Sequence, residues 1–126
     1  MRYITYTLLA AATVVLLMAP VLVGDARPVR VVGDVRYEIL EAGPLYIYTT
    51  NVVVRKGAAE KAYFFSVGSS GPVLPLTILN LKNAFPNNHA FHDNLDMMFK
   101  NDSDLRKFDT FHKTFKVNHL LEASER

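Results

Sequence analysis

The apolar and polar positions of the chain fall into three successive patterns. Residues 8–23 are apolar or small throughout. Between residues 29 and 76, apolar residues alternate with polar ones or gather in short β-branched runs, which is the period-2 pattern of half-buried strands. From residue 78 onward, apolar residues recur every three or four positions, as in amphipathic helices. The pattern therefore predicts a leader, a β-rich half and a helical half.

The β-rich half predicts an antiparallel meander of three to four strands over about residues 29–76. Residues 35–39 alternate strictly between apolar and charged side chains. Residues 45–55 are rich in β-branched and aromatic residues on both faces, which favours a central strand. Residues 72–76 contain two prolines, so we expect an edge strand there. Turns are predicted at three glycine-containing segments: residues 43–44, 56–60 and 68–71.

Three helices are predicted in the helical half, over about residues 78–85, 89–100 and 104–121. The second has an apolar stripe that begins at Phe91 and follows the i, i+4, i+7, i+8 spacing. The stripe of the third consists of Leu105, Phe108, Phe111 or His112, and Phe115. These side chains are expected in the core, where replacing Phe108 or Phe111 by Ala would cost about 3–5 kcal/mol. Packing this helical layer on one face of the meander buries the apolar side of both and gives an α+β fold.

Residues 1–26 match a secretory signal peptide that would form a signal helix. Arg2 precedes the apolar run, and the small residues Gly24 and Ala26 stand two apart, as at a cleavage site. The alternative is an uncleaved anchor, because residues 3–23 approach the ~20 residues that cross a bilayer. With cleavage we expect an exported bacterial protein, periplasmic or extracellular. Without cleavage, residues 3–23 would anchor the protein in the inner membrane.

Composition narrows the classes of function for residues 27–126, which at this length form a single small domain. The formal net charge of the chain is +2 and its basic residues are scattered, unlike the surface of a nucleic-acid-binding protein. There is no cysteine, which excludes disulfides, thiol catalysis and cysteine-based zinc sites. The sequence has no nucleophile motif, phosphate-binding loop or EF-hand loop. We therefore predict a domain that is not an enzyme and uses no cofactor.

A short run of histidines and aspartates is the candidate for chemistry. Four side chains at helical i, i+3 and i+4 spacing could face one way and hold a divalent metal ion: His89, His92, Asp93 and Asp96. His112 and His119, seven residues apart, could add a ligand from the next helix. The alternative is structural, because His92 aligns with the apolar stripe of its helix, and capping and solvent exposure account for the other three.

Part of the chain carries a resemblance, in the segment that joins the two halves and in the tail. The matching residues are Pro75-Leu76-Thr77, Asn80-Leu81-Lys82, Ala84-Phe85-Pro86-Asn87-Asn88, and the tail from Phe111-His112-Lys113 to Leu121. On these residues the chain resembles uncharacterised small exported proteins of the Bacteroidota type, in which a β-rich segment ends in a turn and a Pro-Leu-Thr step leads to a helical tail. The resemblance covers about half the chain. It implies export and supplies no activity, cofactor or catalytic residue.

Three hypotheses for function follow from the sequence. The first is a small exported, non-enzymatic domain that binds a protein or cell-envelope component. The second is a divalent-metal-binding protein that uses the His89/His92/Asp93/Asp96 helix. The third is a membrane-anchored accessory subunit held by an uncleaved leader, and membrane contact is expected only in this case.

Overall fold

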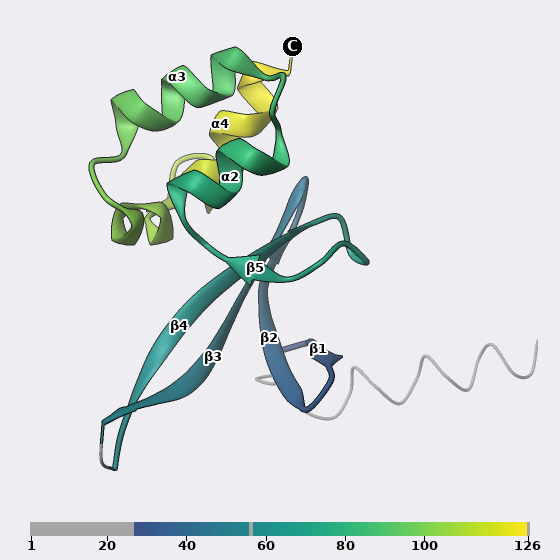
Figure 1. Ribbon diagram of the computed structural model, residues 1–126. Coiled ribbons are helices and arrows are strands. Elements are labelled where there is room, and N and C mark those ends of the chain that lie inside the picture. Colours follow the sequence, from purple (N-terminus) through teal and green to yellow (C-terminus); the bar gives the residue numbers. More distant parts are fainter. Residues whose placement is uncertain (1–26, 56, 126) are drawn as a thin grey trace, which may run out of the picture.

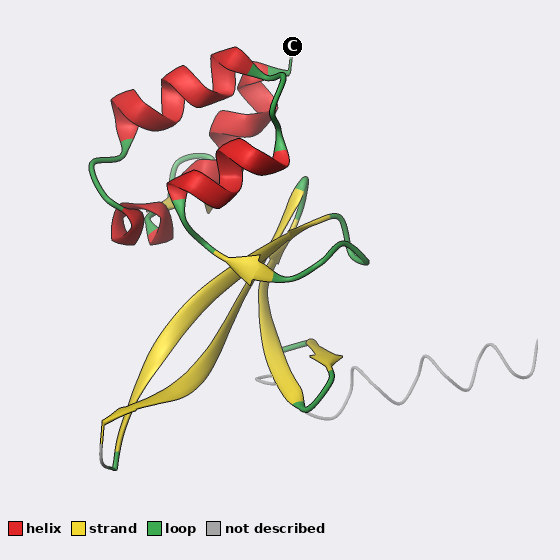
Figure 2. Ribbon diagram, viewed as in Figure 1, coloured by secondary structure: helices red, strands yellow, loops and turns green. Residues whose placement is uncertain are grey.

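The computed structural model describes residues 27–55 and 57–125, so the predicted leader at residues 1–26 lies outside the described residues. The described β-rich half contains β1 (Val29–Val32), β2 (Val35–Ala42), β3 (Leu45–Arg55), β4 (Ala58–Val67) and β5 (Leu74–Pro75). They form one antiparallel sheet whose spatial order is the order of the sequence (Figures 1 and 2). The predicted α+β fold and meander are confirmed, with five strands instead of three to four. Within residues 27–55 and 57–125, no helix is long and apolar enough to span a membrane.

The helical half contains α2 (Ile78–Ala84), α3 (His89–Met98), the 3-10 helix η1 (Asp102–Arg106), β6 (Phe108–Asp109), β7 (Thr114–Phe115) and α4 (Lys116–Ser124). The first two predicted helices are confirmed, and each begins at a capping side chain. The Thr77 hydroxyl accepts the N–H of Asn80 at 3.1 Å. The Asn88 side chain accepts the N–H of Phe91 at 3.1 Å. Such caps satisfy backbone donors that have no partner within the first helical turn.

A third helix is present, but its predicted bounds, about residues 104–121, are wrong. This segment contains the end of η1, a hairpin of β6 and β7, and then α4. The hairpin pairs Phe108 with Phe115. The Asp109 carboxylate accepts two backbone N–H groups from the following turn, and Lys113 adopts a left-handed φ of 56°. These contacts turn the chain and use donors that a helix would need, so α4 begins only after the hairpin.

The predicted burial of Phe108 and Phe111 is also wrong. Phe111 is 84% exposed and Phe108 is 48% exposed, whereas Leu105 and Phe115 from the same predicted stripe are buried. In a hairpin the side chains of successive residues point to opposite faces. Phe111 lies in the turn between β6 and β7, outside both strands, so its spacing from Phe108 and Phe115 does not place it on a buried face.

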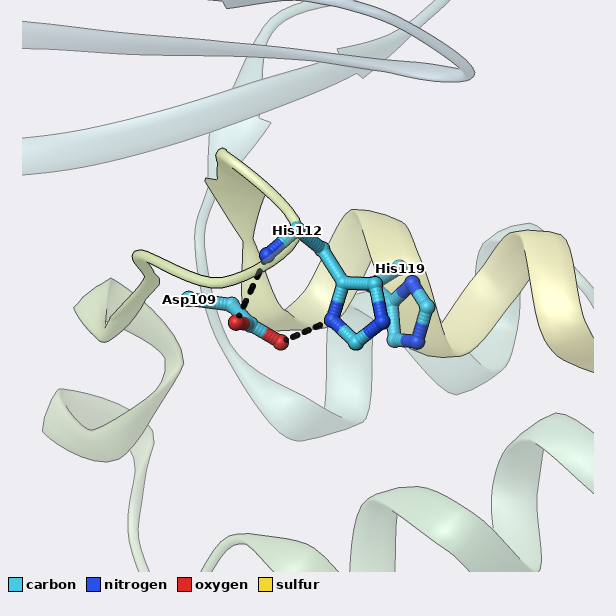
Figure 3. A group of neighbouring side chains, drawn as sticks. All are labelled: Asp109, His112 and His119. Carbon is cyan, nitrogen blue, oxygen red and sulfur yellow. Dashed lines mark hydrogen bonds and ion pairs between the residues drawn. The ribbon is translucent and has the colours of Figure 1, made fainter.

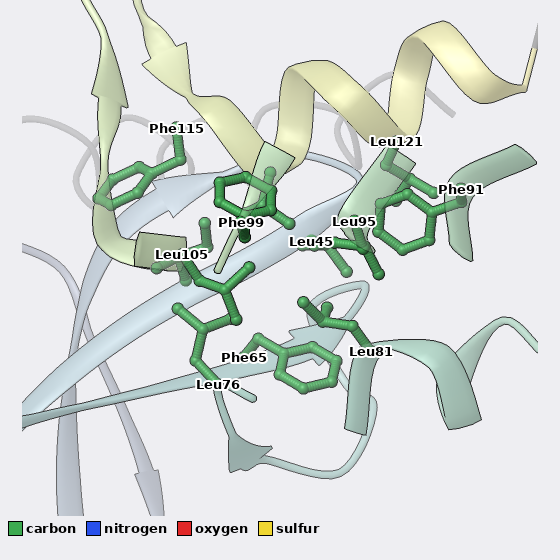
Figure 4. Close-up of a cluster of buried hydrophobic side chains, with 12 residues drawn as sticks. Leu45, Phe65, Leu76, Leu81, Phe91, Leu95, Phe99, Leu105, Phe115 and Leu121 are labelled. Carbon is green, nitrogen blue, oxygen red and sulfur yellow. The ribbon is translucent and has the colours of Figure 1, made fainter. Parts of the chain in front are cut away.

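The hydrophobic core lies at one end of the sheet, where the helices cover it (Figures 1 and 4). The sheet contributes Leu45, Ile47 and Phe65, which are fully buried. The helical half contributes buried side chains from each of its helices: Leu81, Phe91, Leu95, Leu105, Val117 and Leu121. The two layers thus bury their apolar sides against each other, as the α+β prediction requires.

The far halves of β3 and β4 extend away from the helices (Figure 1). In the described part of the sheet, β2 pairs with β3 only between residues 46 and 49, and β5 pairs with β4 only at Phe64 and Phe65. Residues 50–53 and 59–62 pair with each other beyond these points and form what we call the distal ribbon. Among the described residues no further strand pairs with either edge of this ribbon, and all of its side chains are exposed or half-buried.

The sheet face opposite the helices carries a smaller aromatic cluster. The ring centroid of Tyr37 lies 5.1 Å from that of Phe64 and 5.8 Å from that of Tyr48. Tyr48 is fully buried, and its hydroxyl is hydrogen-bonded to the Ser66 hydroxyl at 2.7 Å and to the Arg30 guanidinium at 3.0 Å. A side chain of β1 thus reaches residues of β3 and β4, which requires a strongly coiled sheet.

Candidate functional site

The β6–β7 hairpin is built around one aspartate. Asp109 Oδ1 accepts the backbone N–H of Phe111 at 3.0 Å and that of His112 at 3.1 Å. Aspartate commonly stabilises turns through such side-chain to backbone bonds. The second oxygen, Oδ2, accepts a hydrogen bond from Nδ1 of His112 at 2.7 Å. Because a carboxylate only accepts, the proton of this bond belongs to the imidazole.

His119 of α4 completes the group that we call the Asp109/His112/His119 cluster (Figure 3). Its ring stacks on that of His112, with centroids 3.8 Å apart and an angle of 20° between the planes. Each residue offers one potential metal-ligand atom, and these atoms lie within 4.8 Å of one another. The hydrogen bond from the His112 ring, followed by the one from its backbone N–H, lowers the pKa of Asp109, which is therefore ionised at neutral pH.

The position of α4 is fixed by a buried asparagine next to His119. Asn118 Oδ1 accepts the N–H of Leu45 at 2.9 Å, and its Nδ2 donates to the Leu45 carbonyl at 3.0 Å. The same Nδ2 also donates to the Glu41 carboxylate at 2.6 Å. A Cβ at Gly43 would lie 3.1 Å from this Nδ2, so a larger residue there would require the Asn118 side chain to shift by a few tenths of an ångström. The end of the sheet and the start of α4 are thereby locked together.

Glu41 connects the hairpin to the same end of the sheet. Its carboxylate accepts the backbone N–H of Phe115 at 3.0 Å and the hydroxyl of Thr114. These bonds hold β7 against the end of β2. Both chain segments that carry the histidine pair, the hairpin and α4, are therefore tied to the same rigid corner of the sheet.

Two hollows meet at the cluster. A cleft of about 460 Å³ lies between the β2–β3 turn and the hairpin, and its lining includes His112, His119, Lys113 and Glu122. His119 also lines a smaller hollow of about 140 Å³, together with Asp109, Lys116 and the apolar side chains of Met98, Phe99 and Leu120. The rings of both histidines are thus open to solvent-filled space.

Two of the four residues predicted on α3, His92 and Asp96, have partners outside the set. His92 Nε2 lies 2.8 Å from the carbonyl oxygen of Phe85 and 3.1 Å from that of Lys82, so it donates to the end of α2. Asp96 forms an ion pair with Lys82 at 2.7 Å. The His89 ring packs edge-on against His92, with centroids 5.9 Å apart.

The potential metal-binding group that the described residues form is therefore a different one from that predicted. The four residues predicted together, His89, His92, Asp93 and Asp96, do not form such a group within the described ranges. The structure brings together His112 and His119, which the sequence singled out, with Asp109, which it did not. The signal for Asp109 was its position at the start of a turn, three residues before His112.

The fold and this cluster define the molecule as a small α+β domain with a histidine–carboxylate group beside a surface cleft. Comparison of the chain with protein-family models, with curated proteins and with solved structures gives no match. Conclusions about function therefore rest on the residues of this chain.

Proposed function

We propose that this chain is a small exported, non-enzymatic domain that binds a protein or cell-envelope component through the distal ribbon. The observation that carries the proposal is the position of the ribbon, whose two edges lie outside the sheet pairing and whose faces lie outside the core. Free strand edges pair readily with a further strand, and strand addition is a common mode of peptide recognition. A two-stranded ribbon is also only marginally stable alone, so a partner would stabilise it.

The charges of the ribbon favour a partner other than a second copy. Glu60 and Lys61 lie at the exposed edge strand β4. A symmetric antiparallel pairing of two β4 edges centred on either residue would place like charges opposite each other, which is destabilising. An extended segment of a different molecule avoids this repulsion.

Export is supported by the signal-peptide pattern of residues 1–26. If the leader is retained, with residues 3–23 as an anchor, the same ribbon would serve a membrane-anchored accessory subunit. The intact mass of the protein recovered from the cell envelope distinguishes the two. We expect a mass that starts near Arg27, and a full-length mass would overturn cleavage.

Site-specific crosslinking tests the ribbon as the binding element. A photo-crosslinking amino acid is placed at Val53 in the ribbon or, as a control, at Met97 on α3, since these side chains are 77% and 75% exposed. After irradiation of intact cells we expect a crosslinked product of defined mass from position 53 and none from position 97. No product from position 53, or the same products from both positions, would contradict the proposal.

A further inference from the structure

We propose that the Asp109/His112/His119 cluster binds a divalent first-row transition-metal ion such as Zn²⁺, Ni²⁺ or Cu²⁺. In this site His112 and His119 are the ligands, and Asp109 is the carboxylate that orients His112. Neutral imidazole is a common ligand for these ions, whereas Mg²⁺ and Ca²⁺ prefer sets of oxygen ligands.

Asp109 is placed to orient His112 and not to coordinate an ion itself. Its Oδ1 accepts two backbone N–H groups and its Oδ2 accepts the Nδ1 proton of His112. This hydrogen bond fixes the tautomer, so that Nε2 of His112 carries the lone pair and is free to ligate. Metal-ligating histidines in proteins usually donate their other ring N–H to a carboxylate in this way.

The second ligand, His119, lies directly against the first. Two imidazole nitrogens bound to one ion at about 2.0–2.1 Å in tetrahedral geometry are about 3.3 Å apart. The two rings are stacked with their centroids 3.8 Å apart, so their nitrogens already lie close to one another. With His112 held by Asp109, rotation of the His119 ring about its broad χ2 torsion would direct its nitrogen toward the same ion.

The backbone holds both ligands in place before any ion arrives. The turn at Asp109 fixes His112, and the bonds of Asn118 to Leu45 fix the segment of α4 that carries His119. Preorganised ligands lose little conformational entropy on binding. The cleft beside the two rings is lined by the flexible carboxylate Glu122, one turn after His119, and is open to water, so oxygen atoms can fill the remaining coordination positions.

Titration calorimetry of the full-length gene product, recovered as the cell processes it and stripped with EDTA, tests this site. Zn²⁺, Ni²⁺ and Cu²⁺ are added at pH 7.5, where free imidazole is mostly neutral. We expect one ion bound per chain for at least one of the three metals. His119→Gln should abolish this binding, and His89→Gln, on α3, should leave it unchanged. No stoichiometric binding, retention in His119→Gln, or loss in His89→Gln would overturn the site.

The positioning role of Asp109 has a separate readout. In Asp109→Asn the amide oxygen can still accept the two backbone N–H groups, but the amide nitrogen donates to Nδ1 of His112 and moves the proton to Nε2. We expect metal affinity to fall about 10–100-fold. The ¹⁵N spectrum of the metal-free variant should show His112 changing from the Nδ1–H to the Nε2–H tautomer. Unchanged affinity together with a changed tautomer would show that Asp109 does not act through His112.

Discussion

The two ends of the β3–β4 hairpin have similar residues and opposite environments. At the end near the helices, Leu45, Ile47 and Phe65 are fully buried. At the other end, Val52 and Val53 are exposed, although they are as β-prone as the buried residues. Sequence preference therefore forms the strands along their whole length, whereas burial depends on how far the helical layer reaches.

The largest expected difference between the two ends is in core stability. Phe65→Ala removes a fully buried side chain at the covered end and should lower the free energy of unfolding by about 3–5 kcal/mol. Val53→Ala in the ribbon should change it by no more than about 0.5 kcal/mol. Urea unfolding followed by circular dichroism measures both. A comparable loss for Val53→Ala would show that the ribbon is packed in solution.

A smaller effect is expected from the lock at the covered end. Asn118→Ala leaves the backbone N–H and carbonyl of Leu45 without their side-chain partner, and we expect a total cost of about 1–3 kcal/mol. The control is Asn80→Ala, since the side-chain bond from Asn80 to the Pro75 carbonyl is exposed. The midpoint temperature of thermal unfolding should fall clearly for Asn118→Ala and hardly at all for Asn80→Ala. Equal decreases in the midpoint temperature would mean that the hydrogen bonds between Asn118 and Leu45 do not form.

Lowering the pH should reduce the stability of the helical end, because Asp104 becomes protonated. Its pKa is lowered, chiefly by the backbone hydrogen bond from Lys100 and also by the charge of Lys107. A carboxyl whose pKa is lower in the folded state adds stability above its unfolded pKa, about 3.9, and this is lost as the pH falls through the folded pKa. Asp104→Asn should therefore flatten the fall in unfolding free energy below about pH 4. An unchanged pH profile would contradict the assignment.

The smallest effect is expected at Phe111, on the hairpin turn. Because the side chain is exposed, Phe111→Ala should change the free energy of unfolding by less than about 0.5 kcal/mol. Phe115→Ala, at a buried position of the same hairpin, is the control and should cost several times more. Urea titrations of the pair decide between the hairpin and a continuous helix, since a helix would bury Phe111 and make the two costs similar.

Local signals made much of the fold predictable from the sequence. Glycine and proline marked the turns of the meander, and the spacing of the apolar residues marked α2 and α3. The prediction for the segment after η1 failed because the spacing of Phe108, Phe111 and Phe115 is compatible with a helical stripe as well as with a hairpin. Only the hydrogen bonds of the Asp109 turn decide between the two, and such bonds have no periodicity in the sequence.

The candidate site was predictable only in part. His112 and His119 were predicted only as residues of one helix that could add a ligand to the α3 set. They lie against each other because the hairpin folds back onto α4. The metal site predicted on α3 rested on i, i+3 and i+4 spacing. This spacing shows which side chains share a helix face, but it does not show which partners those side chains bind. His92 is hydrogen-bonded to the end of α2, a contact between two helices that helical spacing does not encode.

The bonds between Asn118 and Leu45 also constrain the order of folding. They join residues 73 positions apart, so closing this contact costs loop entropy that local contacts do not. A helix as short as α4 is unstable in isolation and needs the sheet to form. The first residue of β3 in turn lacks these partners until the last helix has been synthesised. The covered end of the sheet should therefore become fully stable only when the chain is complete to α4, which makes folding of this domain a late, all-or-none event.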